Sequence, residues 1–316
     1  MSTKIKISLP DTVGEDATEI EQIIMSHAPA DSVIVETYSE EPVNIQEWID
    51  RTKDVDGIVL GWKYPDEALN AAKNMKAISF MGTGIADQLN LATCEERGIA
   101  AYNVTGYGDN AVAELAIALM FATWHKIPTL NNEVHSGTWT EVNRRELQGS
   151  TLGIIGYGGI GKRVAEIADC LGMHIKIWSR SLTPGSKLDH GEAATLDEVL
   201  ASSDVVSVHL ALNPETINFI NAASFAKMKD GAVFLNTARA DVVDTDALVE
   251  ALKNGKIASA GVDVFSSEPV PADNPLLGIP NAVLTPHIGY NTENAVKKLH
   301  EIGTLNLVKH FWPDAV

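Results

Sequence analysis

The stretch Leu152-Gly-Ile-Ile-Gly-Tyr-Gly-Gly-Ile-Gly161 decides the fold, because a short apolar run leads directly into the pattern Gly-x-Gly-x-x-Gly. An amphipathic segment follows and ends at Gly172. In a strand, turn and helix of this kind, the first glycine permits the tight turn, the second lets the backbone approach a pyrophosphate, and the third lets the helix pack on the strand. The N–H groups at the start of the helix then face the anion. We therefore predict a dinucleotide site made by Gly156, Tyr157, Gly158, Gly159, Ile160 and Gly161.

Short apolar runs alternate with longer amphipathic segments on both sides of this turn. Before it, the expected strands are residues 4–9, 32–38, 57–60, 77–81 and 100–104. From the turn onward they are residues 152–155, 174–179, 204–210, 231–236, 259–265 and 282–285. Strands that alternate with helices are typical of βα units and parallel sheets. The expected fold class is therefore α/β with two parallel-sheet domains, Rossmann-like or flavodoxin-like.

The length of 316 residues also favours two domains, at about 150 residues each. A long helical pattern over 110–125 and a polar stretch over 131–148 lie between the two series of strands. A last helical pattern over 292–311 is expected to return to the first series. We predict one domain from residues 1–104 and 290–316, a second from 105–289, and an active-site cleft between them.

Composition limits the partners. The chain has 42 Asp and Glu against 24 Lys and Arg, a net charge of −18, which argues against nucleic acid or an anionic membrane surface. Its two cysteines form no CxxC pair and no cluster of zinc-ligand spacing, so no metal is expected. The first residues have a strand pattern and no charged start followed by an apolar run, and no apolar stretch approaches the ~20 residues of a membrane span. We expect a cytoplasmic protein.

Cofactor selectivity should be decided at the end of the strand after the glycine turn. An acidic side chain there bonds the ribose hydroxyls of NAD. This sequence has Ser179, Arg180 and Ser181 instead. A cation with two hydroxyls suits a 2′-phosphate, so we expect NADP(H). The alternative is that Arg180 is a solvated surface residue and NAD(H) binds without the acidic contact.

Three further strand ends carry polar residues, at the edge where an open α/β sheet usually binds its ligand. Arg239 is suited to fork onto a substrate carboxylate, although a surface ion pair is an equal alternative. Glu268 and His287 lie 19 residues apart and meet only through the fold. A carboxylate that pairs with an imidazole orients the ring and stabilises its protonated form, as a general acid near neutral pH requires. A structural His–Glu pair remains the alternative.

The ordered motifs resemble the D-isomer-specific 2-hydroxyacid dehydrogenase family, which includes glyoxylate/hydroxypyruvate reductases, D-lactate dehydrogenases and phosphoglycerate dehydrogenases. The clear part of the resemblance extends from Ala77 to Thr292. Besides the glycine turn, the matching motifs are Gly82-Thr-Gly84, Asn103-Val-Thr-Gly106, Ala113-Glu114, Gly137-Thr-Trp139, His209-Leu-Ala-Leu-Asn-Pro214-Glu-Thr216, Asn236-Thr-Ala-Arg239, Gly261-Val-Asp263, Glu268-Pro269 and Thr285-Pro-His287.

The resemblance implies a role for each of these residues. Arg239 would bind the substrate carboxylate and carbonyl, His287 would be the acid/base, and Glu268 would hold His287. The N–H groups of Thr83 and Gly84 would take the carboxylate from the first domain, which becomes the substrate-binding domain, while 105–289 becomes the dinucleotide-binding domain. Asp263 would bond the nicotinamide carboxamide, and the other implied cofactor contacts are Ala211, Thr216, Thr237, Ala238 and Gly289. The resemblance also implies a homodimer formed through 110–148.

The expected function is hydride transfer from NADPH or NADH to a small anionic 2-keto acid such as glyoxylate, hydroxypyruvate or pyruvate, giving the D-2-hydroxy acid. One alternative is a non-catalytic dinucleotide-sensing protein, which resembles the C-terminal-binding-protein corepressors. Another is a phosphoglycerate dehydrogenase, which would need a basic cluster in the first domain, where the loop at Lys63 offers one lysine. With a net charge of −18, the anion site must be a local positive island built from Arg239, Arg180 and helix N-termini.

Overall fold

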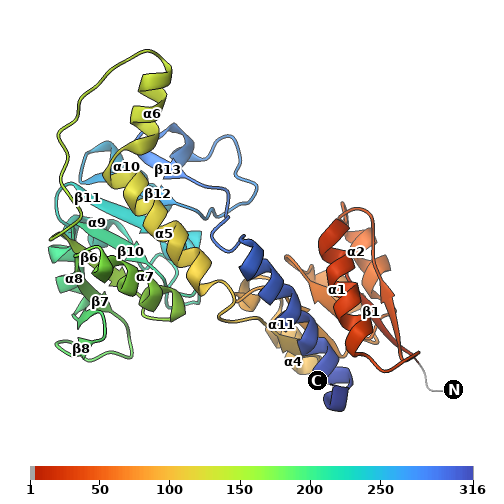
Figure 1. The fold of residues 1–316 in the computed structure, drawn as a ribbon. Coiled ribbons are helices and arrows are strands. Elements are labelled where there is room, and N and C mark those ends of the chain that lie inside the picture. Colours follow the sequence, from red (N-terminus) through yellow and green to blue (C-terminus); the bar gives the residue numbers. More distant parts are fainter. Residues whose placement is uncertain (1–3, 316) are drawn as a thin grey trace. The chain divides into compact units, whose positions relative to one another are not determined.

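The computed structural model describes residues 4–315, and the chain divides into two compact units. The first comprises residues 1–107 and 293–316, and the second comprises residues 108–292. Both divisions lie three residues beyond the expected ones at 104 and 289, and residues 1–3 and 316 lie outside the described residues. Each unit contains one sheet that is wholly or mainly parallel (Figure 1), so the predicted α/β class is confirmed.

The first unit has a five-stranded parallel sheet in the order β2-β1-β3-β4-β5. Its strands are β1 (Ile5–Ser8), β2 (Val33–Glu36), β3 (Gly57–Leu60), β4 (Ala77–Phe80) and β5 (Ala100–Tyr102). Every residue of β3 and β4 is buried, as expected for central strands with both faces covered.

Five helices accompany this sheet: α1 (Gly14–His27), α2 (Ile45–Thr52), α3 (Asp66–Ala71), α4 (Leu91–Arg97) and α11 (Glu293–Phe311), with 3₁₀ turns η1 (Ile85–Asp87) and η4 (Pro313–Ala315). The last helix, α11, packs on α1, β3 and β4. The hydroxyl of Ser79 donates to the carbonyl of Gly303 at 2.7 Å, which ties the helix to the sheet. The C-terminal segment therefore belongs to the first unit, although it follows the second in sequence.

The second unit has an eight-stranded sheet in the order β13-β12-β11-β10-β6-β7-β9-β8, parallel except for the pair β8–β9. The strands are β6 (Thr151–Ile155), β7 (His174–Trp178), β8 (Lys187–Leu188), β9 (Gly191–Ala193), β10 (Val205–Val208), β11 (Ala232–Asn236), β12 (Ile257–Val262) and β13 (Ala282–Leu284). The strand order reverses at β6, whose neighbours are β7 and β10. Ligands of open α/β sheets bind at such a switch point, outside the carboxyl ends of the strands.

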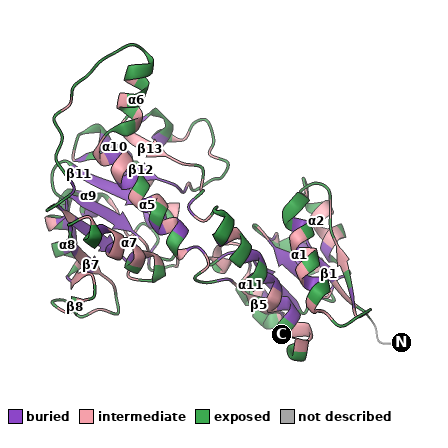
Figure 2. Ribbon diagram, viewed as in Figure 1, coloured by how far each residue is buried: buried purple, intermediate pink, exposed green. Residues whose placement is uncertain are grey.

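Helices cover both faces of this sheet. They are α5 (Asp109–Trp124), α6 (Ile127–His135), α7 (Gly159–Cys170), α8 (Leu196–Ser202), α9 (Ala222–Lys227) and α10 (Thr245–Lys253), with 3₁₀ turns η2 (Ala240–Val242) and η3 (Pro275–Gly278). Successive side chains of β6 enter different cores, since Ile154 packs with α5 and α7 whereas Ile155 packs with α8, α9 and α10. Figure 2 shows the central strands buried and the surface of α6 largely exposed.

Two local features differ from the sequence expectation. The polar stretch after α5 begins within a helix, α6, because Ile127, Leu130 and Val134 recur at helical spacing and Pro128 lies in its first turn. The small hairpin β8–β9 was not expected and extends the sheet beyond β7. Within residues 4–315, no helix is both long and apolar enough to cross a membrane.

Candidate active site

The glycine turn connects β6 to α7, and three of its glycines have different steric surroundings. Gly156 has a φ of +104°, and a Cβ there would lie 2.4 Å from the carbonyl oxygen of His209. A Cβ on Gly161 would lie 2.2 Å from the carbonyl oxygen of Gly156. By contrast, a Cβ on Gly158 would meet nothing within 4 Å. The chain therefore needs glycine at 156 and 161 for its own packing, and at 158 it leaves open space over the start of α7.

The other residues of the turn face the neighbouring helices. A Cβ on Gly159 would lie 1.8 Å from Oδ2 of Asp109, the first residue of α5. Tyr157 and Ile160 are partly buried and pack against the core beneath α5 and α7. Burial raises the pKa of Tyr157. The packing of Tyr157 and Ile160 thus holds the turn in place. The first N–H groups of α7 have no partner within the helix.

Ser179, Arg180 and Ser181 follow β7. The two serine hydroxyls lie 3.3 Å apart, and the backbone turns here because the N–H of Leu182 donates to the carbonyl of Ser179. The guanidinium of Arg180 forms an ion pair with the carboxylate of Glu215, which belongs to the loop after β10. The cation expected at this position is present, with a protein carboxylate beside it.

The loop after β10 contains Ala211 and Thr216. The Thr216 hydroxyl donates to the carbonyl of Ala211 at 2.7 Å and accepts from the N–H of Asn213 at 2.8 Å. At the strand end itself, Nε2 of His209 lies 2.9 Å from the hydroxyl of Ser207, and burial lowers the pKa of His209 to about 4. Its imidazole is therefore neutral at pH 7.

Thr237, Ala238 and Arg239 follow β11. The side chain of Asn236 holds this segment, since its amide nitrogen donates to the carbonyl of Arg239 and its oxygen accepts from the N–H of Ala238, both at 3.0 Å. The guanidinium of Arg239 donates to the carbonyl of Ala238 at 2.8 Å. Arg239 is thus fixed at the sheet edge immediately before η2.

Asp263 follows β12 and is buried. Its Oδ1 accepts from the hydroxyl of Thr285 at 2.6 Å and from the N–H of Ile288 at 3.0 Å, and its Oδ2 accepts from the N–H of Gly289 at 2.9 Å. One carboxylate therefore holds residues 285–289, the segment that carries His287.

Glu268 and His287 are in direct contact. Nδ1 of His287 lies 2.6 Å from Oε2 of Glu268, and the other carboxylate oxygen accepts from the N–H of Phe265 at 2.8 Å. The backbone of His287 has a φ of +52°, in the left-handed region that non-glycine residues seldom adopt. Its N–H donates to the carbonyl of Asp263, so the strained conformation is held from β12.

In the first unit, Thr83 and Gly84 follow β4. The Thr83 hydroxyl donates to the carbonyl of Val104 at 2.8 Å, and the side-chain amide of Asn103 donates to the carbonyl of Thr83 at 2.7 Å. These bonds fix the Gly82–Gly84 turn at the carboxyl edge of its own sheet.

Comparisons with known proteins show the family of the chain. The family model "D-isomer specific 2-hydroxyacid dehydrogenase, NAD binding domain" matches residues 117–289, more than half of the chain. The chain belongs to this family. As a dehydrogenase of this family, it transfers a hydride between a nicotinamide dinucleotide and a small 2-keto or 2-hydroxy acid.

Three relatives illustrate the range of similarity. The hydroxypyruvate reductase of Blautia hydrogenotrophica is 36% identical over 84% of this chain and 84% of its own length. The D-3-phosphoglycerate dehydrogenase of Archaeoglobus fulgidus is 40% identical over 74% of this dehydrogenase, which spans only 45% of that longer relative. The crystal structure of a glyoxylate reductase from Paecilomyes thermophila matches with a TM-score of 0.86 and 32% identity, over 99% of this chain and 96% of the other.

The sheet edge of this dehydrogenase fits a dinucleotide. Gly158 leaves open space at the N-terminus of α7, where a pyrophosphate requires close approach. Two buried polar atoms at the same edge, Nδ1 of His209 and Oγ1 of Thr237, have no hydrogen-bond partner in the described part of the chain. Buried polar groups of this kind normally have one, so both suit a ligand or ordered water.

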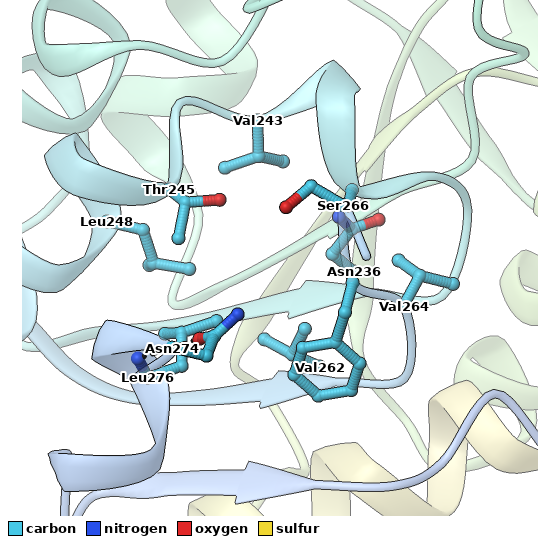
Figure 3. Close-up of a pocket in the computed structure, with 11 residues that line it drawn as sticks. Asn236, Val243, Thr245, Leu248, Val262, Val264, Ser266, Asn274 and Leu276 are labelled. Atoms are coloured by element: carbon cyan, nitrogen blue, oxygen red, sulfur yellow. Dashed lines mark hydrogen bonds between the residues drawn. The ribbon is translucent and has the colours of Figure 1, made fainter. Parts of the chain in front are cut away.

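A small cavity lies among the ends of β11 and β12, the start of α10 and η3 (Figure 3). Its volume is about 10 Å³, enough for about one water molecule. It is lined by Asn236, Ala240, Val243, Thr245, Leu248, Val262, Val264, Phe265, Ser266, Asn274 and Leu276. A keto acid does not fit there, so this cavity of the dehydrogenase is not its substrate pocket.

Sequence reasoning missed several residues that shape this site. No role was predicted for Asn236, His209 or Thr285. Each is nevertheless a polar residue at or just beyond a strand end, which is the same signal that identified Arg239. Glu215 was missed because nothing in the sequence links it to Arg180, which lies 35 positions away. The positive φ of His287 has no sequence signal, since histidine is not a residue that favours it.

Proposed function

We propose that this dehydrogenase reduces a small anionic 2-keto acid of the glyoxylate, hydroxypyruvate or pyruvate type to the D-2-hydroxy acid, with NADPH as the preferred cofactor. The observation that carries the proposal is the contact between His287, which follows β13, and Glu268, which follows β12. The strand β12 lies between β13 and β11, the strand that presents Arg239. A proton donor and a carboxylate-binding cation then follow strands of the same sheet edge, with β12 between them. The names of the hydroxypyruvate reductase and glyoxylate reductase relatives support this substrate class.

Each residue of the proposed site has its own role in the reaction. The bound dinucleotide supplies the hydride. Arg239 binds the carboxylate and carbonyl oxygen of the keto acid, and the N–H groups of Thr83 and Gly84 bind the carboxylate from the first unit. Nε2 of His287 gives its proton to the carbonyl oxygen, and Glu268 orients the ring through Nδ1.

The proposed dinucleotide contacts follow the strand ends in order. The glycine turn holds the pyrophosphate, and Asp263 and Gly289 lie near the nicotinamide, with Thr237 and Ala238 between. Ala211 and Thr216 line the adenosine side, where Ser179, Arg180 and Ser181 take the 2′-phosphate of NADP(H). No acidic side chain follows β7 directly to favour NAD(H).

A substrate panel tests both halves of the proposal. Glyoxylate, hydroxypyruvate, pyruvate, phenylpyruvate and 3-phosphohydroxypyruvate are each assayed with NADPH and with NADH. We expect the highest kcat/KM for an unphosphorylated keto acid with NADPH. A preference for NADH, or equal efficiency, would overturn the cofactor assignment. Binding of NADPH without turnover of any keto acid would favour a dinucleotide-sensing protein instead.

Phosphoglycerate dehydrogenase activity is the second candidate, because the Archaeoglobus fulgidus relative, which is 40% identical, is named a D-3-phosphoglycerate dehydrogenase. It predicts that 3-phosphohydroxypyruvate is the best substrate of the panel. The loop after β3 offers Lys63 as an exposed cation for the phosphate. Lys63→Ala would then raise the KM for the phosphorylated substrate and leave that for hydroxypyruvate unchanged.

We also propose a homodimer formed through residues 110–148. Ile127, Val134 and Trp139 expose 51%, 56% and 81% of their surfaces in this segment, and a partner subunit would bury this apolar surface. Light scattering should give twice the chain mass of 33.9 kDa, and a monomer would contradict the proposal.

For localisation we propose the cytoplasm. Cys94 and Cys170 are unpaired thiols, which suits a reducing compartment. Cell fractionation followed by immunodetection tests this assignment, and recovery in a secreted fraction would contradict it.

A further inference from the structure

The ion pair between Arg180 and Glu215 crosses the switch point of the second sheet. Arg180 follows β7, Glu215 lies in the loop after β10, and these two strands flank β6, which leads into the glycine turn. The pair therefore joins the two sides of the edge at which a dinucleotide binds. This is the edge at which the adenosine ribose of a dinucleotide is proposed to bind.

The backbone around Glu215 is held firmly. Its N–H donates to the side-chain oxygen of Asn213 at 2.9 Å, and the hydroxyl of the next residue, Thr216, is bonded to both Asn213 and Ala211. The carboxylate therefore starts from a fixed point close to Arg180. The side chains themselves are 68% and 73% exposed for Arg180 and Glu215, so either one can turn away from the other at small cost.

A carboxylate and a cation at this position favour different cofactors. A carboxylate repels a 2′-phosphate but accepts hydrogen bonds from the 2′- and 3′-hydroxyls of an unphosphorylated ribose. Nucleotide sites of this kind usually take that carboxylate from the end of the strand after the turn, where this chain has Ser179. Here a carboxylate from the loop after a different strand, β10, lies beside Arg180, the next residue along the chain.

We infer that Glu215 is a cofactor-selecting residue, which competes with the 2′-phosphate of NADPH for Arg180 and accepts the ribose hydroxyls of NADH. This inference rests on the proposed placement of the adenosine ribose beside Arg180. NADPH displaces Glu215 from the guanidinium on binding, whereas NADH leaves the ion pair in place. Glu215 thus reduces the preference for NADPH that Arg180 creates.

Three variants test the inference: Glu215→Gln, Arg180→Gln and, as a control, Asp197→Asn. The control removes the carboxylate of another exposed ion pair, Lys227–Asp197, from the same unit with the same change in net charge. Dissociation constants for NADPH and NADH are measured by fluorescence titration at low and high salt.

We expect Glu215→Gln to bind NADPH about tenfold more tightly at low salt, with a smaller gain at high salt, and to bind NADH a few-fold more weakly. The control should change both constants by less than about twofold. If Glu215→Gln leaves the ratio of the two constants within twofold of the wild type, Glu215 does not select the cofactor. Arg180→Gln tests the proposed NADPH site by itself, because this variant loses affinity for NADPH only if Arg180 binds the 2′-phosphate. A loss of NADPH affinity in Arg180→Gln, together with an unchanged ratio in Glu215→Gln, would contradict the role of Glu215 and leave the proposed function intact.

Discussion

Nδ1 of His287 lies 2.6 Å from Oε2 of Glu268, and the N–H of Phe265 fixes the other carboxylate oxygen at 2.8 Å. The carboxylate is therefore held by the backbone after β12 while it orients an imidazole that follows β13. This arrangement leaves Nε2 as the ring nitrogen that can meet a substrate carbonyl. The fold thus sets the proposed proton donor in place.

Glu268→Gln tests whether that carboxylate serves the chemistry. The amide keeps the size of the side chain but cannot stabilise a protonated imidazole, so we expect kcat to fall by about 10²-fold or more. Since Glu268 touches no dinucleotide in our account, the dissociation constant for NADPH should stay the same. A variant with wild-type kcat would mean that the pair is only structural.

Asp263→Asn tests the anchor of the segment that carries His287. The carboxylate accepts three hydrogen bonds, and an amide nitrogen in its place would face at least one N–H donor. We expect the free energy of unfolding to fall by about 1–3 kcal/mol and kcat to fall with it. Urea unfolding and steady-state kinetics measure the two effects, and a variant that retains both values would show that residues 285–289 are held by other contacts.

Two glycines of the turn form a matched pair. Gly161→Ala places a methyl group 2.2 Å from the carbonyl oxygen of Gly156, so the second unit should lose about 1–3 kcal/mol of stability. Gly158→Ala meets no protein atom within 4 Å and should leave stability unchanged. That methyl group enters the space assigned to the pyrophosphate, so NADPH should bind about tenfold more weakly. If Gly158→Ala binds NADPH as tightly as the wild type, the pyrophosphate does not bind at this turn.

The free energy of unfolding depends on pH through the carboxyl group of Asp11, in the first unit. Burial raises its pKa to about 6, although its carboxylate accepts from the N–H groups of Gly61 and Trp62. Because the folded pKa lies above the unfolded value of 3.8, its contribution is fully present below about pH 4 and is lost as the pH rises through 6.

The unfolding free energy of the wild type should therefore fall by about 2 kcal/mol relative to that of Asp11→Asn between pH 4 and pH 7. Parallel urea titrations at several pH values measure this difference. A constant difference across that range would show that Asp11 does not titrate there.

Much of the fold could be predicted from local patterns. The glycine turn and the apolar runs identified most strands, because parallel strands buried on both faces are continuously apolar. The helix α6 was missed because its apolar residues, Ile127, Leu130 and Val134, are few and are followed by a long polar segment. The hairpin β8–β9 was missed because its strands have only two and three residues.

The site was predictable where its residues end strands and unpredictable where they depend on long-range contacts. Arg239, Glu268 and His287 follow apolar runs, and the parallel sheet brings their strand ends together. The three bonds of Asp263 and the pairing of Arg180 with Glu215 join segments that are distant in sequence. No spacing rule predicts such contacts, because they depend on the order of strands in the sheet.

The most direct test compares the wild type with His287→Gln in the NADPH-dependent reduction of the best keto acid of the panel. We predict steady turnover by the wild type, a fall of about 10²- to 10⁴-fold in kcat for the variant, and an unchanged dissociation constant for NADPH. A His287→Gln variant that turns over at the wild-type rate would contradict the assignment of His287 as the proton donor.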